Sequence, residues 1–341
     1  MKMFKKVLAG FIATAMIASL AACGGSSAPA ETDTEAAAAE TVQEEKVLNV
    51  NAANKLIYCI HPSTSNPFFG TVKTAAEAKG QELGYTVKSV SHDDDATKQA
   101  ELFDTAISEG ASFIICDNAG ADASIEAAQK AVDAGIAVFM VDREINQEGI
   151  CSGQLVADNA QGATECAEYL VELTGGKGKY AELLGKESDT NCQVRSDAFH
   201  AVIDETEMEM VAQQSANWEQ TEGQQKAETI LQQYPDIIAI VCGNDTMACG
   251  AAAAVKAANL DHEVFIIGVD GSNDMRDNIK GGLTHATALQ QIDLITRTAV
   301  EQGVKLMEEG TTGVEQEKQL IPCQLINKDN ADKLDNFVFA E

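Results

Sequence analysis

Residues 57–69 read IYCIHPSTSNPFF and predict a strand, a polar loop and the start of a helix in immediate succession. The first four residues are apolar, as in a short buried strand. Asn66 suits a helix N-cap, and Pro67 suits the first helical position, where its missing N–H costs nothing. Neighbouring helical residues cannot both face one core, so either Phe68 or Phe69 should project from the carboxyl edge of the sheet, where open α/β folds bind ligands. The alternative is that both rings pack beneath the loop.

The same alternation of apolar runs and amphipathic stretches continues to residue 309. Strands are expected at 56–60, 86–91, 113–117, 137–142, 151–157, 179–184, 209–215, 237–243, 264–270 and 285–289. Helices are expected at 67–83, 96–109, 122–134, 159–174, 192–204, 220–233, 246–258, 272–281 and 292–309. The apolar runs are continuous and rich in β-branched residues, as in parallel strands covered on both faces. The pattern divides near Ala157 and therefore predicts an α/β fold of two doubly wound, Rossmann-like parallel-sheet lobes.

The N-terminus carries the pattern of an export signal. Three lysines precede an apolar stretch at 7–20, and Leu20-Ala21-Ala22-Cys23-Gly24 resembles a bacterial lipobox. This pattern predicts a lipoprotein signal peptide at 1–22 and a mature protein that is lipid-anchored to the cell membrane through Cys23; an ordinary secretory signal is the alternative. Residues 23–54 are rich in Gly, Ser, Ala and Glu without periodic apolar positions, and are expected to form a flexible linker.

The composition excludes some partners. The 341 residues include 53 Asp and Glu against 24 Lys and Arg, which argues against binding to nucleic acid or to anionic membrane surfaces. The eight cysteines after Cys23 form no CxxC pair, and most lie in apolar runs, so they are expected to be small buried hydrophobic residues. One or two disulfides remain compatible with the sequence.

Polar and aromatic side chains gather where the expected strands end. In chain order they are Asn66, Phe68, Phe69, Asp142, Arg143, Asn244, Asp270 and Gln290, with Arg195 near a helix start and Trp218 at a strand exit. Each residue alone has an ordinary explanation as a turn, a cap, an ion pair or a core residue. Together, charged planar groups and amides can hydrogen-bond vicinal hydroxyls, while aromatic faces cover a sugar ring. The set predicts a site for a neutral polyhydroxylated ligand.

These motifs, in this order, resemble the periplasmic binding proteins of the ribose-binding type, the substrate receptors of ABC sugar importers. The matching motifs are Asn66-Pro67-Phe68-Phe69, Asp142-Arg143, Arg195-Ser196-Asp197-Ala198-Phe199, Asn244-Asp245-Thr246-Met247-Ala248, Asp270-Gly271 and Gln290. The resemblance implies that one sugar is bound by Asn66, Phe68, Phe69, Asp142, Arg143, Arg195, Trp218, Asn244, Asp270 and Gln290. Trp218 replaces a common Phe, Ala198 replaces Gly, and the loop at 187–193 is unusually polar. The resemblance implies a ribose-like pentose, and these departures make a smaller or linear ligand, such as a tetritol or pentitol, the alternative.

The resemblance also implies the organisation of the chain. The N-terminal lobe would comprise 55–157 plus 291–318 and the C-terminal lobe 158–290 plus 319–341, joined by a three-segment hinge. Ligand in the cleft would stabilise a closed form that docks on an ABC transporter permease. The protein is expected to act outside the cytoplasm, to be a monomer, and to need no cofactor or metal.

Other functions find less support in the sequence. His92-Asp93-Asp94-Asp95 could ligate a metal, but a solvated loop with Asp95 capping the next helix is favoured. Neither a glycine-rich phosphate loop nor a nucleophile paired with a base is present, so nucleotide binding and catalysis are not expected. A sensory lipoprotein that presents its ligand to a chemoreceptor or kinase is the main alternative. A sugar-responsive transcription regulator would need a basic helix-turn-helix where this chain has the lipobox.

Overall fold

The computed structural model describes residues 47–340. The expected signal peptide at 1–22, the lipidation site Cys23 and most of the expected linker lie outside the described residues. Within the described residues, no helix is both long enough and apolar enough to cross a membrane.

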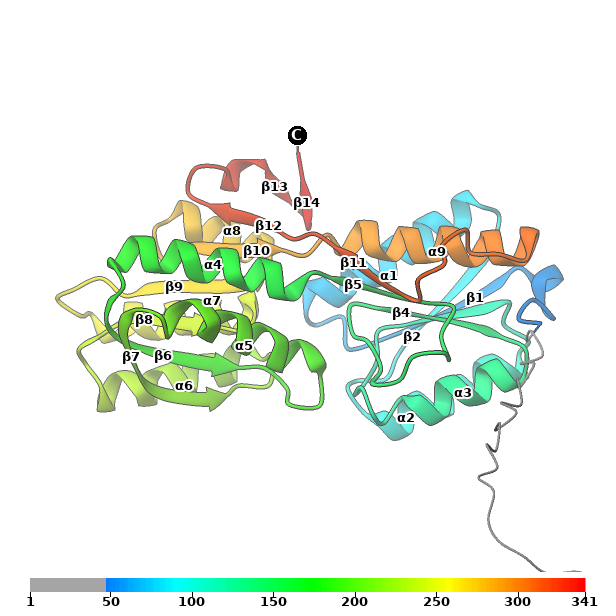
Figure 1. The fold of residues 1–341 in the computed structure, drawn as a ribbon, viewed down its shortest axis with the longest axis horizontal. Helices are drawn as coiled ribbons and strands as arrows, with labels where there is room; N and C mark the ends of the chain where they lie inside the picture. Colours follow the sequence, from blue (N-terminus) through cyan, green and yellow to red (C-terminus); the bar gives the residue numbers. More distant parts are fainter. Residues whose placement is uncertain (1–46, 341) are drawn as a thin grey trace, which may run out of the picture. The chain divides into compact units, whose positions relative to one another are not determined.

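The first lobe is built on a parallel sheet with strand order β11-β5-β4-β3-β1-β2. Its strands are β1 (Leu56–His61), β2 (Thr86–Ser91), β3 (Phe113–Cys116), β4 (Ala137–Val141), β5 (Gly153–Ala157) and β11 (Lys318–Ile321). Helices α1 (Pro67–Glu82) and α9 (Ile292–Glu309) cover one face, while α2 (Ala96–Ser108) and α3 (Ile125–Asp133) cover the other, as Figure 1 shows. Side chains of β1 alternate between two apolar clusters, one on each face of this sheet.

The second lobe repeats this plan with strand order β12-β10-β9-β8-β6-β7. Its strands are β6 (Lys177–Leu184), β7 (Glu207–Ser215), β8 (Ile237–Cys242), β9 (Phe265–Asp270), β10 (Ala286–Leu289) and β12 (Gln324–Asn327). Its helices are α4 (Asn159–Thr174), α5 (Thr190–Ile203), α6 (Gln220–Gln233), α7 (Asp245–Ala258) and α8 (Asn273–Lys280). Two short 3-10 helices, η1 (Ala52–Asn54) and η2 (Ala331–Lys333), and the hairpin β13 (Leu334–Asp335) with β14 (Val338–Phe339) complete the described elements. The predicted fold of two doubly wound α/β lobes is confirmed.

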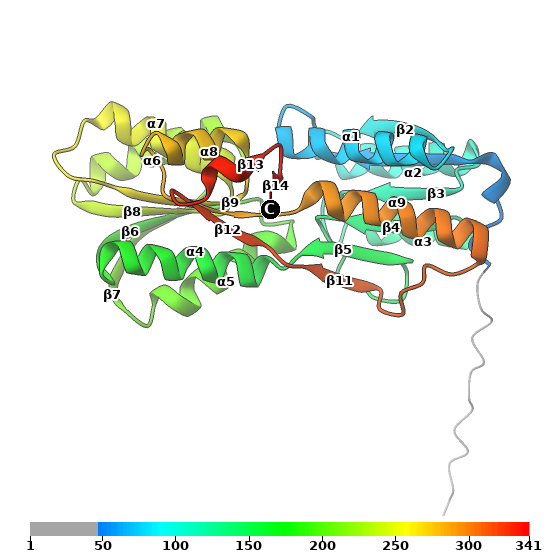
Figure 2. The same cartoon turned by 90° about the horizontal axis from the view of Figure 1, so that it is seen from above.

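The chain passes between the lobes three times (Figure 2). The first passage joins β5 to α4 and the second joins β10 to α9. In the third, β11 pairs with β5 through Ile321 and β12 then pairs antiparallel with β10, so this passage lies at 322–323. It comes a few residues after the expected boundary at 318, because β11 and β12 are four-residue strands with half-exposed side chains and therefore a weak apolar pattern.

Residues 47–54, which the sequence assigned to the linker, are folded against the first lobe. Asn49 forms a bridge with Ile136, and η1 follows it. Asn51 Nδ2 donates to the carbonyl oxygen of Ala111 at 3.2 Å, and Asn54 Nδ2 donates to that of Gly110 at 2.8 Å. The assignment of this segment to the linker is therefore corrected. The segment lacks an apolar period because its asparagine side chains hold it in place, through hydrogen bonds to a turn about 60 residues further along the chain.

All eight cysteines among the described residues are buried and free. Burial raises the pKa of Cys59 to about 12. Burial and the nearby Asp245 carboxylate raise the pKa of Cys249 to about 12 as well. They behave as the small apolar core residues that the sequence predicted.

Candidate functional site

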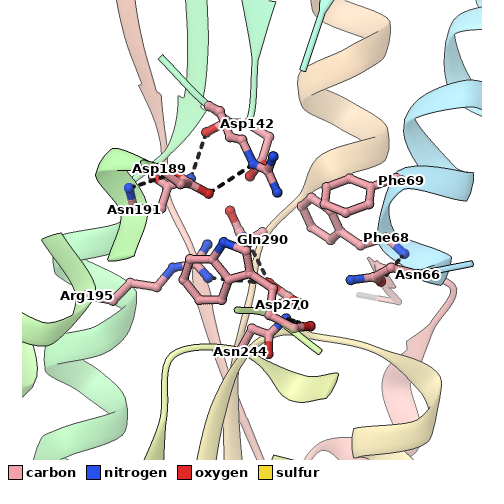
Figure 3. Close-up of a pocket in the computed structure, with 12 residues that line it drawn as sticks. Asn66, Phe68, Phe69, Asp142, Asp189, Asn191, Arg195, Asn244, Asp270 and Gln290 are labelled. Carbon is pink, nitrogen blue, oxygen red and sulfur yellow. Dashed lines mark hydrogen bonds and ion pairs between the residues drawn. The ribbon is translucent and has the colours of Figure 1, made fainter. Parts of the chain in front are cut away.

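A small cavity lies where the carboxyl ends of strands from both sheets face each other (Figure 3). The residues that line it are Asn66, Phe68, Phe69, Asp142, Arg143, Asp189, Asn191, Arg195, Trp218, Asn244, Asp270 and Gln290. The structure thus brings together all ten residues that the sequence singled out, and adds Asp189 and Asn191.

The start of α1 forms one wall. Asn66 caps the helix, because its Oδ1 accepts from the backbone N–H of Phe68 at 3.0 Å. Phe68 and Phe69 meet edge to face with ring centroids 5.6 Å apart, and Phe337 packs against Phe68 at 5.5 Å. Both rings are buried and both line the cavity, so the expectation that only one would project is wrong. The helix begins at the cavity edge, and its first turn therefore presents two successive side chains there.

Arg143, two residues after β4, is held by several groups at once. Its Nη1 donates to Asp94 Oδ1 at 2.9 Å and to the carbonyl oxygen of Asn118 at 3.0 Å. Its Nε lies 2.9 Å from Asp189 Oδ2, a residue of the second lobe. The guanidinium carbon lies 5.0 Å from the centroid of the Phe69 ring, within cation–π range. The side chain is 3% exposed, so both its charge and its orientation are fixed by the protein.

The second lobe supplies a matching pair, Arg195 and Trp218. Arg195 Nε donates to Asn159 Oδ1 at 2.7 Å and Nη1 donates to the carbonyl oxygen of Gly243 at 2.8 Å. The guanidinium carbon of Arg195 lies 5.3 Å from the Trp218 ring. A Cβ atom on Gly185 would lie 2.0 Å from the indole, so the ring rests directly on the backbone at the end of β6. Each lobe therefore presents one arginine stacked on one aromatic ring.

Amides and a carboxylate complete the second lobe's side of the cavity. Asn244 caps α7, since its Oδ1 accepts from the N–H of Met247 at 3.0 Å. Gln290 Nε2 donates to Asp270 Oδ1 at 2.8 Å, and the same carboxylate oxygen lies 3.7 Å from Arg195 Nη1. Among the described residues, Gln290 Oε1, Asp142 Oδ1 and Trp218 Nε1 are buried without a hydrogen-bond partner from the protein. Arg143 Nε likewise makes no hydrogen bond, despite its ion pair with Asp189. Two acceptors and two donors are therefore available to a ligand.

Burial shifts the protonation of the site's carboxyl groups. Burial raises the pKa of Asp142 to about 7, against the attraction of Arg143. Burial likewise raises the pKa of Asp270 to about 7, against Arg195. Burial alone would lower the pKa of Arg143, but the surrounding carboxylates, Asp189 foremost, raise it above its usual range. Arg143 stays charged, while the pKa values of two carboxyl groups lie near 7, a balance that suits an uncharged ligand rich in hydroxyl groups.

Three cavity residues have backbone angles that side chains seldom adopt. The φ angles are 62° at Asp142, 67° at Trp218 and 139° at Asp270. Each non-glycine residue in such a region costs on the order of 1–3 kcal/mol, and such strain concentrates at binding sites. All three come at or just after the end of a strand, where a sharp change of direction brings the side chain to the cavity.

Asp189 and Asn191 are the two cavity residues that the sequence pattern did not assign to the site. Asp189 is the N-cap of α5, accepting from the N–H of Asn191 at 2.9 Å, which is the common role of Asp before a helix. The signal that could have found them is the polar loop at 187–193, which marks a departure from the family pattern.

The loop at 92–95 has no metal-like arrangement. Asp95 caps α2 and Asp94 pairs with Arg143, while His92 Nε2 lies 2.8 Å from the carbonyl oxygen of Asp117. Within residues 47–340, no group of three or more His, Cys, Asp or Glu side chains could hold a metal ion. Asp94 instead contributes to the site through Arg143.

Comparisons with known proteins agree with this architecture. Residues 57–312 match the periplasmic binding protein domain. The chain is 52% identical over 294 residues to the D-apiose import binding protein of Actinobacillus succinogenes, covering 86% of this chain and 94% of that protein. It is 31% identical over 254 residues to the ribose import binding protein RbsB of Bacillus subtilis, covering 74% of this chain and 82% of that protein.

A solved structure with the same fold is the Caulobacter myo-inositol binding protein bound to myo-inositol. It has a TM-score of 0.78 and 25% identity, covering 83% of this chain and 97% of that chain. The family and these relatives are binding proteins of transport systems, which confirms that the chain is not an enzyme. With two lobes meeting at a polar and aromatic cavity, and with a domain match spanning most of its described residues, the chain belongs to the periplasmic binding protein family.

Proposed function

We propose that this protein is the extracytoplasmic substrate-binding component of an ABC importer and that it captures one small neutral sugar, a pentose of the D-apiose kind. The observation that carries the proposal is the cavity itself: it is lined by an arginine–aromatic pair from each lobe and by unpaired acceptors on Asp142 and Gln290. Hydroxyl groups of a sugar donate to these acceptors, and the aromatic faces cover its C–H groups.

The choice among sugars rests on relatives. The sequence favoured a ribose-like pentose, and that specificity is not confirmed, because two relatives above 50% identity are named for D-apiose import. D-Apiose is a branched pentose, so the expected size class is retained.

A direct test uses the single tryptophan of the chain, because Trp218 lines the cavity and its fluorescence reports on the site alone. Purified protein is titrated with D-apiose, D-ribose, D-allose, myo-inositol and pentitols, and melting temperatures are recorded in parallel. D-Apiose should change the fluorescence and raise the melting temperature most, since a ligand that binds only the native state stabilises it.

Variants link the response to the cavity. Asp142→Ala and Arg195→Ala should abolish the sugar-induced thermal shift while the ligand-free protein stays folded. The control is Asp197→Ala, on the same helix as Arg195 but exposed. A thermal shift retained in both cavity variants would refute this site as the sugar-binding site.

The proposal extends to lipid anchoring through Cys23, which rests on the lipobox in the sequence. Full-length protein expressed in a bacterial host should sediment with membranes, and Cys23→Ser should release it into the soluble extracytoplasmic fraction. Equal release of both forms would contradict the anchor and leave the sugar site unaffected.

A further inference from the structure

The segment 185–191 runs from the end of β6 into the first turn of α5 and reaches from the second lobe to the first. The carbonyl oxygen of Ser188 accepts from the N–H of Ala121 at 3.0 Å. Lys186 Nζ lies 3.5 Å from Asp94 Oδ1 and donates to the carbonyl oxygen of Asp94 at 3.3 Å. With Asp189 and Asn191, this segment supplies a series of direct contacts across the cleft.

Asp189 fixes Arg143 from the opposite lobe. The first lobe holds the outer end of the guanidinium through Asp94 and Asn118. At the inner Nε, its carboxylates Asp117 and Asp142 lie 3.5 and 3.8 Å away, whereas Asp189 Oδ2 of the second lobe is nearest, at 2.9 Å. Asp189 is 5% exposed and Arg143 is 3% exposed, so their attraction is poorly screened by water. Separation of the lobes would remove one side of the arginine's support.

Asn191 connects the two halves of the site by a chain of hydrogen bonds. Its Nδ2 donates to the carbonyl oxygen of Asp142 at 3.1 Å, and its Oδ1 accepts from Asn159 Nδ2 at 3.0 Å. Asn159 Oδ1 in turn accepts from Arg195 Nε at 2.7 Å. These four residues are all buried, and the orientation of Arg195 is thereby linked to the strand-end turn of the other lobe.

We propose that Asp189 and Asn191 are positioning residues that hold both site arginines in their binding orientation only when the lobes are closed. Ligand retention then depends on these contacts across the cleft as well as on contacts with the ligand. This inference rests on the proposed function. It assigns the segment 185–191, which ends in the first turn of α5, the role of a latch, whose members are Lys186, Ser188, Asp189 and Asn191.

The latch makes a kinetic prediction. Association occurs with open lobes, so loss of the latch should leave the association rate within about threefold of wild type, while release becomes at least about tenfold faster. Stopped-flow fluorescence of Trp218 with D-apiose measures both rates in Asp189→Asn, which keeps the shape of the side chain and removes its charge. Asp197→Asn, an exposed residue of the same helix, is the matched control and should behave as wild type.

Lys186→Met provides a second test of the latch that leaves the cavity lining unchanged, because Lys186 is not among the residues that line the cavity. Its partly exposed pair with Asp94 should contribute a two- to fivefold change in release rate that disappears at high salt. Asn191→Ala tests the hydrogen-bond chain independently if Asp189→Asn fails to fold. Slower association with unchanged release in the latch variants, or rates equal to the control, would overturn the proposal.

Small-angle scattering separates the latch from the sugar assignment. Ligand-free Asp189→Asn should have a larger radius of gyration than wild type, because the closed form has lost an interlobe ion pair. If no sugar alters wild-type fluorescence, the proposed function fails, and the scattering comparison still tests the latch. Equal radii for the variant, the control and wild type would refute it.

Discussion

Gly185→Ala should damage the site without changing any side chain that contacts a ligand. The added Cβ would lie 2.0 Å from two atoms of the Trp218 ring and 2.2 Å from a third, far inside van der Waals contact. The indole is only 7% exposed and also lies close to Gly243, so it cannot move aside freely. The ring must therefore leave its position beside Arg195 or force the end of β6 to shift.

The size of the effect follows from how tightly the indole is packed and from what it touches. Overpacking of this kind costs about 1–3 kcal/mol, which for a protein of this size lowers the melting temperature by roughly 2–6 °C. Displacing the indole removes the aromatic face that covers the sugar, an interaction of about 0.5–1.5 kcal/mol, so the sugar should bind roughly 2- to 13-fold more weakly.

The assay combines calorimetric titration with D-apiose and the emission spectrum of Trp218. The matched control is Gly70→Ala on α1, where an added Cβ would have no atom within 4 Å, and where alanine favours the helix. The control should bind as wild type and melt at the same temperature or slightly higher. If Gly185→Ala kept the wild-type spectrum and an affinity within twofold, the indole would not rest on Gly185 as described, and the reasoning would be refuted.

Three further predictions concern the whole fold. Burial holds the pKa of Asp270 at about 7, above the unfolded value of 3.8, so its contribution to stability is complete below pH 3.8 and is lost as pH rises through 7. In denaturant titrations without ligand, Asp270→Asn should therefore have a larger unfolding free energy than wild type above pH 7, and the difference should vanish near pH 4. A difference that does not depend on pH would contradict the pKa shift. Protein starting at residue 55 should melt a few degrees below protein starting at residue 47, because it loses the hydrogen bonds of Asn51 and Asn54; equal melting temperatures would show that this segment adds no stability. In a soluble form lacking residues 1–46, a thiol reagent should label almost none of the eight buried cysteines until denaturant is added, and rapid labelling of the native protein would argue against their burial.

Much of the fold was predictable because its signal is local. Runs such as that from Phe113 to Cys116 are continuous, apolar and β-branched, and they alternate with helices whose caps are legible in sequence, as at Asn66 and Asp95. The rule that parallel strands present ligand residues at their carboxyl ends then placed Asp142 and Asp270 at the ligand-binding edges of their two sheets.

The features that could not be predicted from the sequence depend on contacts between distant segments of the chain. Strand β11 is half exposed and recognisable only by its pairing with β5, about 160 residues earlier. Asp189 looks like an ordinary helix cap, and it is one; its second role requires Arg143, which local sequence does not place nearby. For a residue such as Asp189, local sequence patterns therefore predict the role in its own helix but not the contact with a distant residue.

The strained strand ends explain how the site can select among similar sugars. Asp142, Trp218 and Asp270 are held at positive φ by packed surroundings, and in the closed form the arginines are held by protein groups. Little side-chain ordering then remains for the ligand to induce, so most of the contact energy is available as affinity. The same rigidity means that Asp142 Oδ1 and Gln290 Oε1 cannot find other partners when a sugar lacks the matching hydroxyl. A buried acceptor left unpaired costs about 1–3 kcal/mol, so one misplaced hydroxyl should reduce affinity by roughly 5- to 150-fold.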